Sequence, residues 1–222
     1  MSNSTPIIQA WEENAQEWIR IIDEDAIASR SITNPAIVEA IKEKKPKTLL
    51  DLGCGEGWLC RTLQKAGIQS TGVDAVPALI ERAQQQGGST FQVASYEDFM
   101  NGQVKLPVFE ALVFNFALFQ DAETLPLLKS SRPFLQEGGL LFIQTLHPLT
   151  ILRLGKPYQS QWIEDAWKGL PGNFSHSYSW FARTFAEWVS LFQESPFDLV
   201  EVQEPLLADD SGPASVIFVL QL

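Results

Sequence analysis

The 222-residue sequence is poor in the residues that build disulfides and metal sites, with only two cysteines and two histidines. Cys54 and Cys60 lie in one short stretch, which indicates a reducing compartment, by default the cytoplasm, and no disulfide framework. No Cys/His set has the spacing of metal ligands, so we expect no bound metal. The amino-terminal stretch lacks a basic start followed by an apolar run, and no stretch approaches the roughly 20 apolar residues of a membrane helix. We therefore expect neither a secretory signal nor a membrane span.

Positive charge is also scarce, because 16 Lys and Arg residues face 27 Asp and Glu residues for a net charge of −11. Such a surface repels phosphate backbones, which disfavours nucleic acid as a partner and favours a small-molecule substrate. The basic run from Lys42 to Lys47 is typical of a solvated helix end. The sequence does not indicate an oligomeric state.

Short apolar strands and amphipathic helices alternate through the middle of the chain. Helical spacing starts at Trp11, and a second helix is predicted from Asn34 to about Lys44, with Pro35 at its first helical position. Strands are then predicted near 47–52, 69–74, 90–95, 110–116 and 140–146, with helices at 58–66, 77–86 and 121–135. This alternation predicts parallel strands in one sheet with helices on both faces.

The carboxyl-terminal part breaks the alternation. The strand patterns at 198–205 and 214–222 are joined by a connection too short for a helix, which predicts an antiparallel hairpin. We therefore predict an α/β fold, with a doubly wound, mostly parallel seven-stranded sheet that ends in an antiparallel hairpin.

The strongest functional motif is Leu-Asp-Leu-Gly-Cys-Gly-Glu-Gly at 50–57. A buried strand that ends in glycines allows a tight turn and a close approach of ligand to backbone, where doubly wound sheets bind their ligands. Asp74 ends the second strand, 21 residues after Gly53, and a carboxylate there can accept hydrogen bonds from both ribose hydroxyls of an adenosine-containing cofactor. The alternative is a plain glycine turn with a surface aspartate.

The side chains around this loop distinguish between nucleoside cofactors. A dinucleotide fingerprint needs a small third residue, but Trp58 occupies that position. Asp51, two residues before Gly53, would repel a pyrophosphate and suits the ammonium of an amino acid. S-adenosylmethionine combines an adenosine with an amino-acid tail and has no phosphate. The loop therefore predicts this cofactor, and an NAD(P)-dependent reductase is the disfavoured rival.

Three stretches resemble class I S-adenosylmethionine-dependent methyltransferases of the small-molecule type, such as ubiquinone O-methyltransferases. They are LLDLGCGEG, the following GVDAVPALIERA and the later RPFLQEGGLLFIQTLHP, and the resemblance covers roughly 48–146. It implies a Rossmann-like fold and methyl transfer to a small-molecule acceptor, by our interpretation a hydroxyl, with S-adenosylhomocysteine as product. A non-catalytic regulatory protein that binds S-adenosylmethionine is the alternative from another class.

The resemblance also assigns cofactor contacts. Ser95 stands where the family usually has an acidic residue for the adenine amino group, with Glu97 or Asp98 as substitutes. Asn115 and Phe116 would lie under the cofactor, near the transferred methyl group. The predicted cofactor-binding residues are Asp51, Gly53, Cys54, Gly55, Gly57, Asp74, Ala75, Ser95, Tyr96, Asn115 and Phe116.

One histidine is a candidate catalytic group. His147 follows the fifth strand, where substrate would lie, and an imidazole titrates near neutral pH, so it is the predicted general base for an attacking hydroxyl. The alternative is that His147 is only a structural residue of the turn that precedes Pro148.

An aromatic, locally basic insertion follows that strand. We interpret it as a lid over an apolar acceptor, although the same aromatics suit the core of a small cap. The predicted substrate contacts are Tyr158, Trp162, Tyr178, Trp180 and Arg183, the last to hold a carboxylate unless it is an ordinary solvated arginine. In the amino-terminal helices, Arg30 is a candidate for the cofactor carboxylate.

These predictions divide a single methyltransferase domain, residues 1–222, into four segments. Residues 1–45 form an amino-terminal helical cap, and 47–146 form the cofactor-binding core. Residues 147–183 form the aromatic lid, and 184–222 form a terminal helix and β-hairpin.

Overall fold

A seven-stranded sheet forms the centre of the computed structural model, which describes residues 4–207 and 212–222. In order across the sheet the strands are β3 (Thr90–Val93), β2 (Gln69–Asp74), β1 (Thr48–Leu52), β4 (Phe109–Asn115), β5 (Leu135–Thr145), β9 (Val216–Gln221) and β8 (Asp198–Gln203). The first five are parallel, and β9 runs antiparallel to both β5 and β8. The predicted fold class is therefore confirmed, hairpin included. The hairpin connection predicted at 206–213 lies partly outside the described residues.

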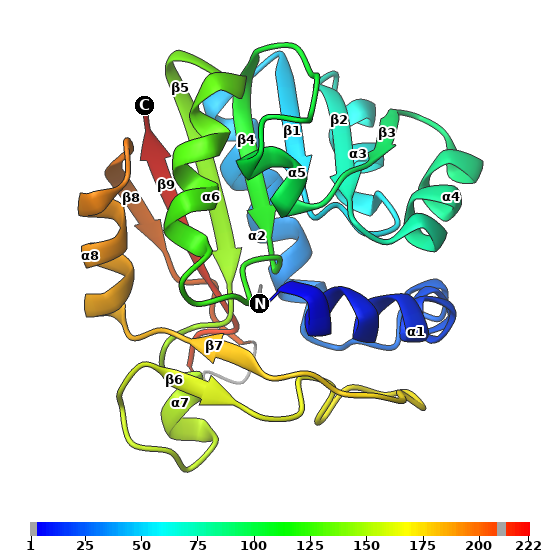
Figure 1. Cartoon of the computed structure of the whole chain (residues 1–222), viewed down its shortest axis with the longest axis vertical. Helices are drawn as coiled ribbons and strands as arrows, with labels where there is room; N and C mark the ends of the chain where they lie inside the picture. Colours follow the sequence, from blue (N-terminus) through cyan, green and yellow to red (C-terminus); the bar gives the residue numbers. More distant parts are fainter. Residues whose placement is uncertain (1–3, 208–211) are drawn as a thin grey trace.

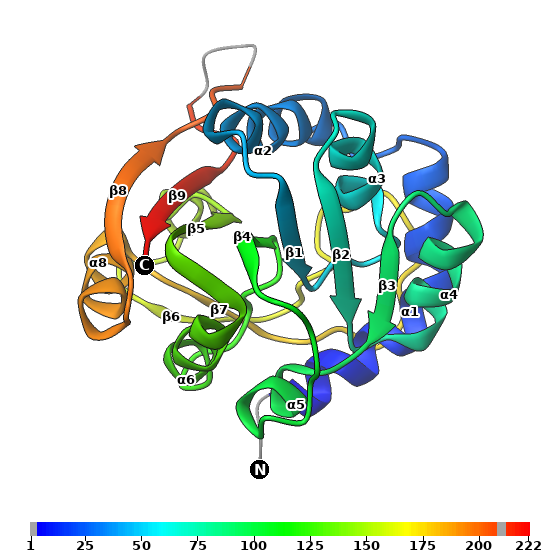
Figure 2. The same cartoon turned by 90° about the horizontal axis from the view of Figure 1, so that it is seen from above.

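Helices cover both faces of this sheet, as Figure 2 shows from above. One face carries α2 (Arg30–Lys44) and α3 (Trp58–Lys65), and the other carries α5 (Tyr96–Met100), α6 (Thr124–Ser131) and α8 (Phe185–Glu194). Further helices are α1 (Ser4–Asp23), α4 (Pro77–Gln86), a short 3-10 turn (Arg132–Phe134) and α7 (Thr150–Arg153). The central strands are buried on both faces, which explains their continuous apolar sequences.

Several predicted boundaries are wrong: α1 begins at Ser4 rather than near Trp11, and the helix predicted at 121–135 ends at Ser131. Helix α2 begins at Arg30 rather than at Asn34, and Pro35 lies inside it. The proline removes one amide donor, whose acceptor would have been the carbonyl of exposed Ser31, and solvent can satisfy that carbonyl. Strand β5 begins at Leu135, five residues early, because Leu135 pairs with Phe109 before a register shift.

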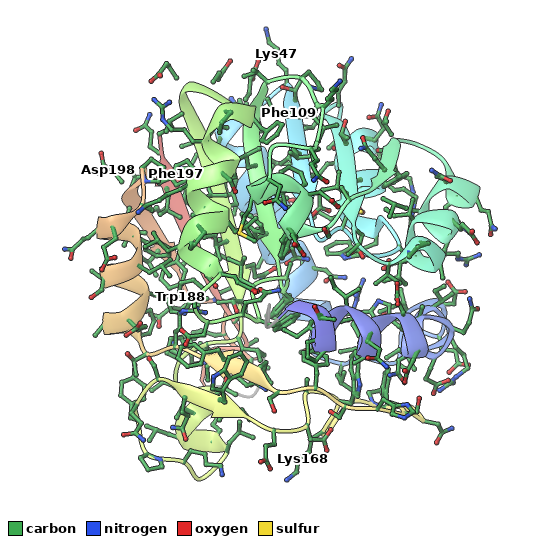
Figure 3. All side chains as sticks on the ribbon, in the orientation of Figure 1. Lys47, Phe109, Lys168, Trp188, Phe197 and Asp198 are labelled. Carbon is green, nitrogen blue, oxygen red and sulfur yellow. The ribbon has the colours of Figure 1, made fainter. Side chains whose placement is uncertain are left out.

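The amino-terminal helix and the insertion both lie at the carboxyl ends of the parallel strands, toward which the arrows of Figure 1 point. The insertion contains α7 and an antiparallel pair, β6 (Gln161–Ile163) and β7 (Trp180–Ala182). Lys168 of the insertion and Lys47, just before β1, mark opposite ends of the molecule in Figure 3. None of the described helices is long and apolar enough to cross a membrane.

Candidate active site

A cavity of about 840 Å³ opens where the parallel strands end. Its walls come from the loops after β1, β2 and β4, from α1 and from the insertion. This volume lies in the upper part of the roughly 300–1,000 Å³ range of ligand sites. Because β4 lies between β1 and β5 in the sheet, its end separates a glycine-loop half of the cavity from a half covered by the insertion.

The glycine loop after β1 is held tightly. The amides of Gly53 and Cys54 both donate to the carbonyl of Val73, at 2.8 and 3.0 Å. Gly53 has φ +83°, and a Cβ there would lie 2.6 Å from that of Ala117. Only glycine therefore fits at this turn.

Asp74 ends β2 and fixes both its own loop and the glycine loop. Its Oδ2 accepts from the amide of Gly55 and its Oδ1 from that of Val76, each at 2.9 Å. Burial raises the pKa of Asp74 in spite of these bonds. A carboxylate oxygen has two lone pairs, so each oxygen can still accept from a ligand hydroxyl.

Asp51 is buried with one oxygen unsatisfied. Its Oδ2 lies 3.6 Å from the Sγ of Cys60, and its Oδ1 has no hydrogen-bond partner among the described residues. Burial, with the nearby carboxylates of Asp74 and Glu56, raises the pKa of Asp51 to about 8. An unpaired buried acceptor at a cavity wall suits a cationic donor such as an ammonium group.

Arg30 brings a positive charge to this acidic half. Its guanidinium lies 5.0 Å from the ring centroid of Trp58, and burial lowers its pKa. Burial raises the pKa of Glu56, which the sequence interpretation missed although it lies inside the glycine motif. The glycine motif allows any residue between Gly55 and Gly57. The only sequence signal that Glu56 lines the cavity was therefore its position within the loop.

The end of β4 presents an amide to the cavity. Asn115 and Phe116, two of the predicted cofactor contacts, both line it, and the Oδ1 of Asn115 is buried without a hydrogen-bond partner in the described chain. Phe116 has φ +51°, and its amide donates to the carbonyl of Gln144 at 2.8 Å. Such backbone strain in a non-glycine residue is concentrated at functional sites.

The insertion and α1 cover the cavity together. Trp11 of α1 donates from its indole to the hydroxyl of Tyr178 at 3.1 Å and packs 4.8 Å from the ring of Trp167. The buried Asn14 accepts from the amide of Ser175 at 2.7 Å. Trp162, Tyr178 and Trp180, three of the predicted substrate contacts, line the cavity.

Two predicted cofactor contacts do not line the cavity. A Cβ on Gly57 would lie 2.6 Å from the ring of Phe91, so this glycine serves helix–strand packing. Ser95 caps α5, where its Oγ accepts from the amide of Asp98 and the Asp98 carboxylate accepts in return. Neither residue therefore faces the cavity, while Ala94 and Tyr96 on either side of Ser95 do line it.

His147, the predicted general base, lies outside the cavity. Its side chain is 1% exposed, its Nε2 lies 2.6 Å from Glu204, and its Nδ1 accepts from the amide of Leu149. The imidazole thus fastens the turn after β5 to the terminal hairpin and does not face the cavity.

Arg183 and Tyr158, two predicted substrate contacts, also lie away from the cavity. Arg183 is buried and donates from Nη2 to the carbonyls of Gln120 and Asp121 and to Thr124 Oγ1, so it braces the segment before α6. The Tyr158 hydroxyl accepts from the amide of Phe185 on the outer surface. Neither side chain reaches the cavity.

Solved structures that share this fold include S-adenosylmethionine-dependent methyltransferases. Magnesium protoporphyrin IX methyltransferase from Synechocystis PCC 6803, solved with S-adenosylhomocysteine, superposes with a TM-score of 0.69 at 16% identity, over 98% of this chain and 99% of that one. The 1,6-didemethyltoxoflavin-N1-methyltransferase of Burkholderia thailandensis gives 0.68 at 16% identity, over 98% and 88%. The fold is thus that of the S-adenosylmethionine-dependent methyltransferases.

Sequence comparison names the family. A family model described as a methyltransferase domain matches residues 30–202, so the chain belongs to this methyltransferase family. Similar curated proteins include a ubiquinone biosynthesis O-methyltransferase of Actinobacillus pleuropneumoniae, 27% identical over 127 residues that make up 52% of this chain and 54% of that protein. A malonyl-[acyl-carrier protein] O-methyltransferase of Halalkalibacterium halodurans is 30% identical over 139 residues, 55% of this chain and 50% of that protein. The chain spans about half the length of these curated relatives.

Proposed function

We propose that the chain transfers a methyl group from S-adenosylmethionine to an oxygen of a small, partly apolar molecule in the cytoplasm. The observation that carries the proposal is one cavity with two unlike halves. One half has the glycine loop, the carboxylates of Asp51, Glu56 and Asp74, and Arg30, and the other is lined by aromatic side chains of the insertion and α1. A charged nucleoside with an amino-acid tail fits the first half, and an apolar acceptor fits the second.

Residues of the first half match the groups of the cofactor. The unpaired Oδ1 of Asp51 suits the ammonium, and the carboxylate of Asp74 suits the ribose hydroxyls. Arg30 would hold the carboxylate of the cofactor, while Ala75 and Tyr96 border the adenine end. At Gly55 an added side chain would meet open space, so the backbone there is free for close contact with the cofactor.

Methyl transfer requires little from the protein beyond positioning of the acceptor and the cofactor. When bound, S-adenosylmethionine supplies a methyl group on a positively charged sulfur, which is already an electrophile. The chain aligns the acceptor and excludes water, and this alignment is the main contribution to the rate. Residues 1–45 and 147–183 form the cover in this proposal, 47–146 hold the cofactor, and 184–222 complete the sheet.

Oxygen as the attacking atom is supported by the names of two relatives, both O-methyltransferases. A small molecule, and not a nucleic acid, is supported by the net charge of −11 and the aromatic cover. The free thiols of Cys54 and Cys60 agree with a reducing compartment.

The test is isothermal titration of the wild type with S-adenosylmethionine and S-adenosylhomocysteine, beside Asp74→Ala. We expect micromolar binding that the variant weakens tenfold or more, about 1.4 kcal/mol. Asp198→Ala is the matched control, because Asp198 is exposed on β8, the far edge of the sheet (Figure 3). Absence of binding to both compounds would overturn the proposed function.

A further inference from the structure

The glycine-loop half of the cavity has more negative than positive charge. Three carboxylates line it, from Asp51 on β1, Glu56 in the glycine loop and Asp74 at the end of β2. Among the described cations only Arg30 lines this half, because the two lysines that line the cavity are exposed residues of the insertion. A ligand that binds here therefore has to supply positive charge.

Glu56 is a buried carboxylate that the chain compensates only in part. It is 3% exposed, and its Oε1 has no hydrogen-bond partner among the described residues. The indole of Trp18 donates a hydrogen bond to the carboxylate, and the Nη2 of Arg61 lies 3.8 Å from Oε1, beyond hydrogen-bond distance. A buried carboxylate oxygen without a donor is stabilised by a further positive charge nearby.

The other ionisable groups that face this half do not compensate the excess. Burial raises the pKa of the thiols of Cys54 and Cys60 and of the Tyr96 hydroxyl, so all three are neutral at pH 7. Asp25 acts on Arg30 from the exposed turn between α1 and α2, where solvent and salt screen its charge. The balance is thus set by the carboxylates and the arginines.

The charges of the cofactor complete this balance. The guanidiniums of Arg30 and Arg61 face the three carboxylates, which leaves one negative charge when all of these groups are ionised. The amino-acid tail of S-adenosylmethionine carries an ammonium and a carboxylate, which cancel, and its sulfonium adds one positive charge. S-adenosylhomocysteine has the same tail but a neutral sulfur. The half is therefore neutral with S-adenosylmethionine and keeps one uncompensated negative charge with S-adenosylhomocysteine.

The covalent structure of the cofactor brings its sulfur to this cluster. The sulfur joins the tail to the ribose, and the proposed partners of these two groups are Asp51 and Asp74. These residues belong to neighbouring parallel strands, in which Leu52 pairs with Val73. The charges of Asp74 and Glu56 both act on the ionisation of Asp51. A charge on the sulfur would therefore act on the whole cluster.

We propose that Glu56 makes the site selective for the sulfonium form of the cofactor over its thioether product. The inference rests on the proposed methyltransferase function and assigns it a specificity-determining residue. Methyl transfer breaks the methyl–sulfur bond, whose electron pair stays on sulfur, while the methyl carbon bonds to the acceptor oxygen and the acceptor proton passes to solvent. One positive charge is thus lost beside a buried carboxylate, which weakens the binding of the product and favours its release.

The experiment measures the affinities of three ligands by isothermal titration at pH 7. They are S-adenosylmethionine, S-adenosylhomocysteine and sinefungin, an analogue in which an amine carries the positive charge in place of the sulfonium. The wild type is compared with Glu56→Gln, which keeps the shape of the side chain without its charge, and with Glu56→Asp, which keeps the charge. Glu39→Gln is the matched control, because Glu39 is exposed on α2. Thermal unfolding checks the fold of each variant.

We expect the wild type to bind both charged ligands at least tenfold more tightly than S-adenosylhomocysteine, a difference of about 1.4 kcal/mol. Glu56→Gln should lose most of this preference, because the site then has one negative charge fewer. Glu56→Asp should retain the preference in part, and Glu39→Gln should retain it in full.

A second measurement needs the wild type alone. Burial raises the pKa of Asp51 and Glu56, so part of the cluster is protonated in the free protein and a positively charged ligand displaces protons. Titrations in two buffers of different ionisation enthalpy should show that S-adenosylmethionine releases more protons than S-adenosylhomocysteine. The ratio of their affinities should accordingly rise from pH 5.5 to pH 7, below the roughly 7.7–8.0 at which an α-amino group ordinarily loses its proton.

Equal affinity for the two cofactor forms, or tighter binding of S-adenosylhomocysteine, would overturn the inference. An unchanged preference in a folded Glu56→Gln would do the same. A preference for S-adenosylmethionine that sinefungin does not share would also overturn it, because that preference would come from the methyl group and not from the charge. In each of these cases both cofactor forms still bind, so the proposed function stands, whereas failure of both to bind refutes the function itself.

Discussion

Replacement of Asp51 by asparagine should make the protein more stable at neutral pH while it weakens cofactor binding. Burial raises the pKa of Asp51 from its ordinary 3.8 to about 8 in the folded chain. In the unfolded chain the carboxyl loses its proton near 3.8, so between these values the folded state holds the extra proton. The free energy of unfolding therefore falls as pH rises through this window, and it levels off above about pH 8.

The size of the effect follows from the width of the window. One pH unit corresponds to about 1.4 kcal/mol, and pH 7 lies roughly three units above the unfolded pKa. The ionisable Asp51 should thus cost on the order of 4 kcal/mol of stability at pH 7, as an upper bound, and almost nothing at about pH 4. An asparagine side chain at this position cannot ionise, so Asp51→Asn should recover most of that difference.

The assay is urea unfolding of wild type and Asp51→Asn at pH 4.5, 6, 7 and 8.5, with exposed Asp198→Asn as the control. The stability gap between Asp51→Asn and wild type should widen with pH and then level off, while the control should show no such trend. The same variant should bind S-adenosylmethionine at least tenfold more weakly, about 1.4 kcal/mol, because the ammonium loses its anionic partner. A gap that stays constant across pH would refute the reasoning.

Three further substitutions test the other parts of the site. Gly53→Ala would place a Cβ 2.6 Å from that of Ala117 at a residue with φ +83°, so it should distort the loop and weaken S-adenosylhomocysteine binding at least tenfold in a calorimetric titration. Affinity equal to that of the wild type would contradict the conclusion that only glycine fits at this turn. Arg183→Met should lower the free energy of unfolding by about 3 kcal/mol, because two buried carbonyls lose their donor, and should leave cofactor affinity unchanged in the folded protein, as urea unfolding and titration would show. His147→Gln should leave the methyl-transfer rate within about twofold of wild type and lower the melting temperature, since His147 binds Glu204 and not the acceptor; a loss of rate near the roughly 10²–10⁴-fold worth of a general base would restore that role.

The sheet and the glycine loop were predictable because each depends on local sequence. Apolar runs that alternate with helical spacing define the strands, and a left-handed turn at Gly53 needs glycine, so both features are visible within a few residues. The pairing of this loop with Asp74 follows from parallel strand order, which places the ends of β1 and β2 side by side.

The side chains after β5 were not predictable in the same way. His147 does follow the strand that leads into the insertion, but the direction of its ring depends on the turn toward α7 and on Glu204, 57 residues away. Arg183 is directed by carbonyls 62 and 63 residues earlier in the chain. The position of a residue in the sequence of a strand predicts whether it lies at the carboxyl end of the sheet. Hydrogen-bond partners far away in the sequence decide whether its side chain faces the cavity.

The joint cover of α1 and the insertion has a consequence for the order of synthesis. Asn14 and its partner Ser175 are 161 residues apart, so α1 leaves the ribosome long before the insertion exists, although α4, which also packs on α1, follows sooner. At about 5–20 residues per second the delay is roughly 8 to 32 s. During that time the indoles of Trp11 and Trp18 lack the aromatic cluster that later covers them. We therefore expect the aromatic side chains of α1 to be incompletely covered in the nascent chain until the insertion emerges, so that the cavity closes late in folding.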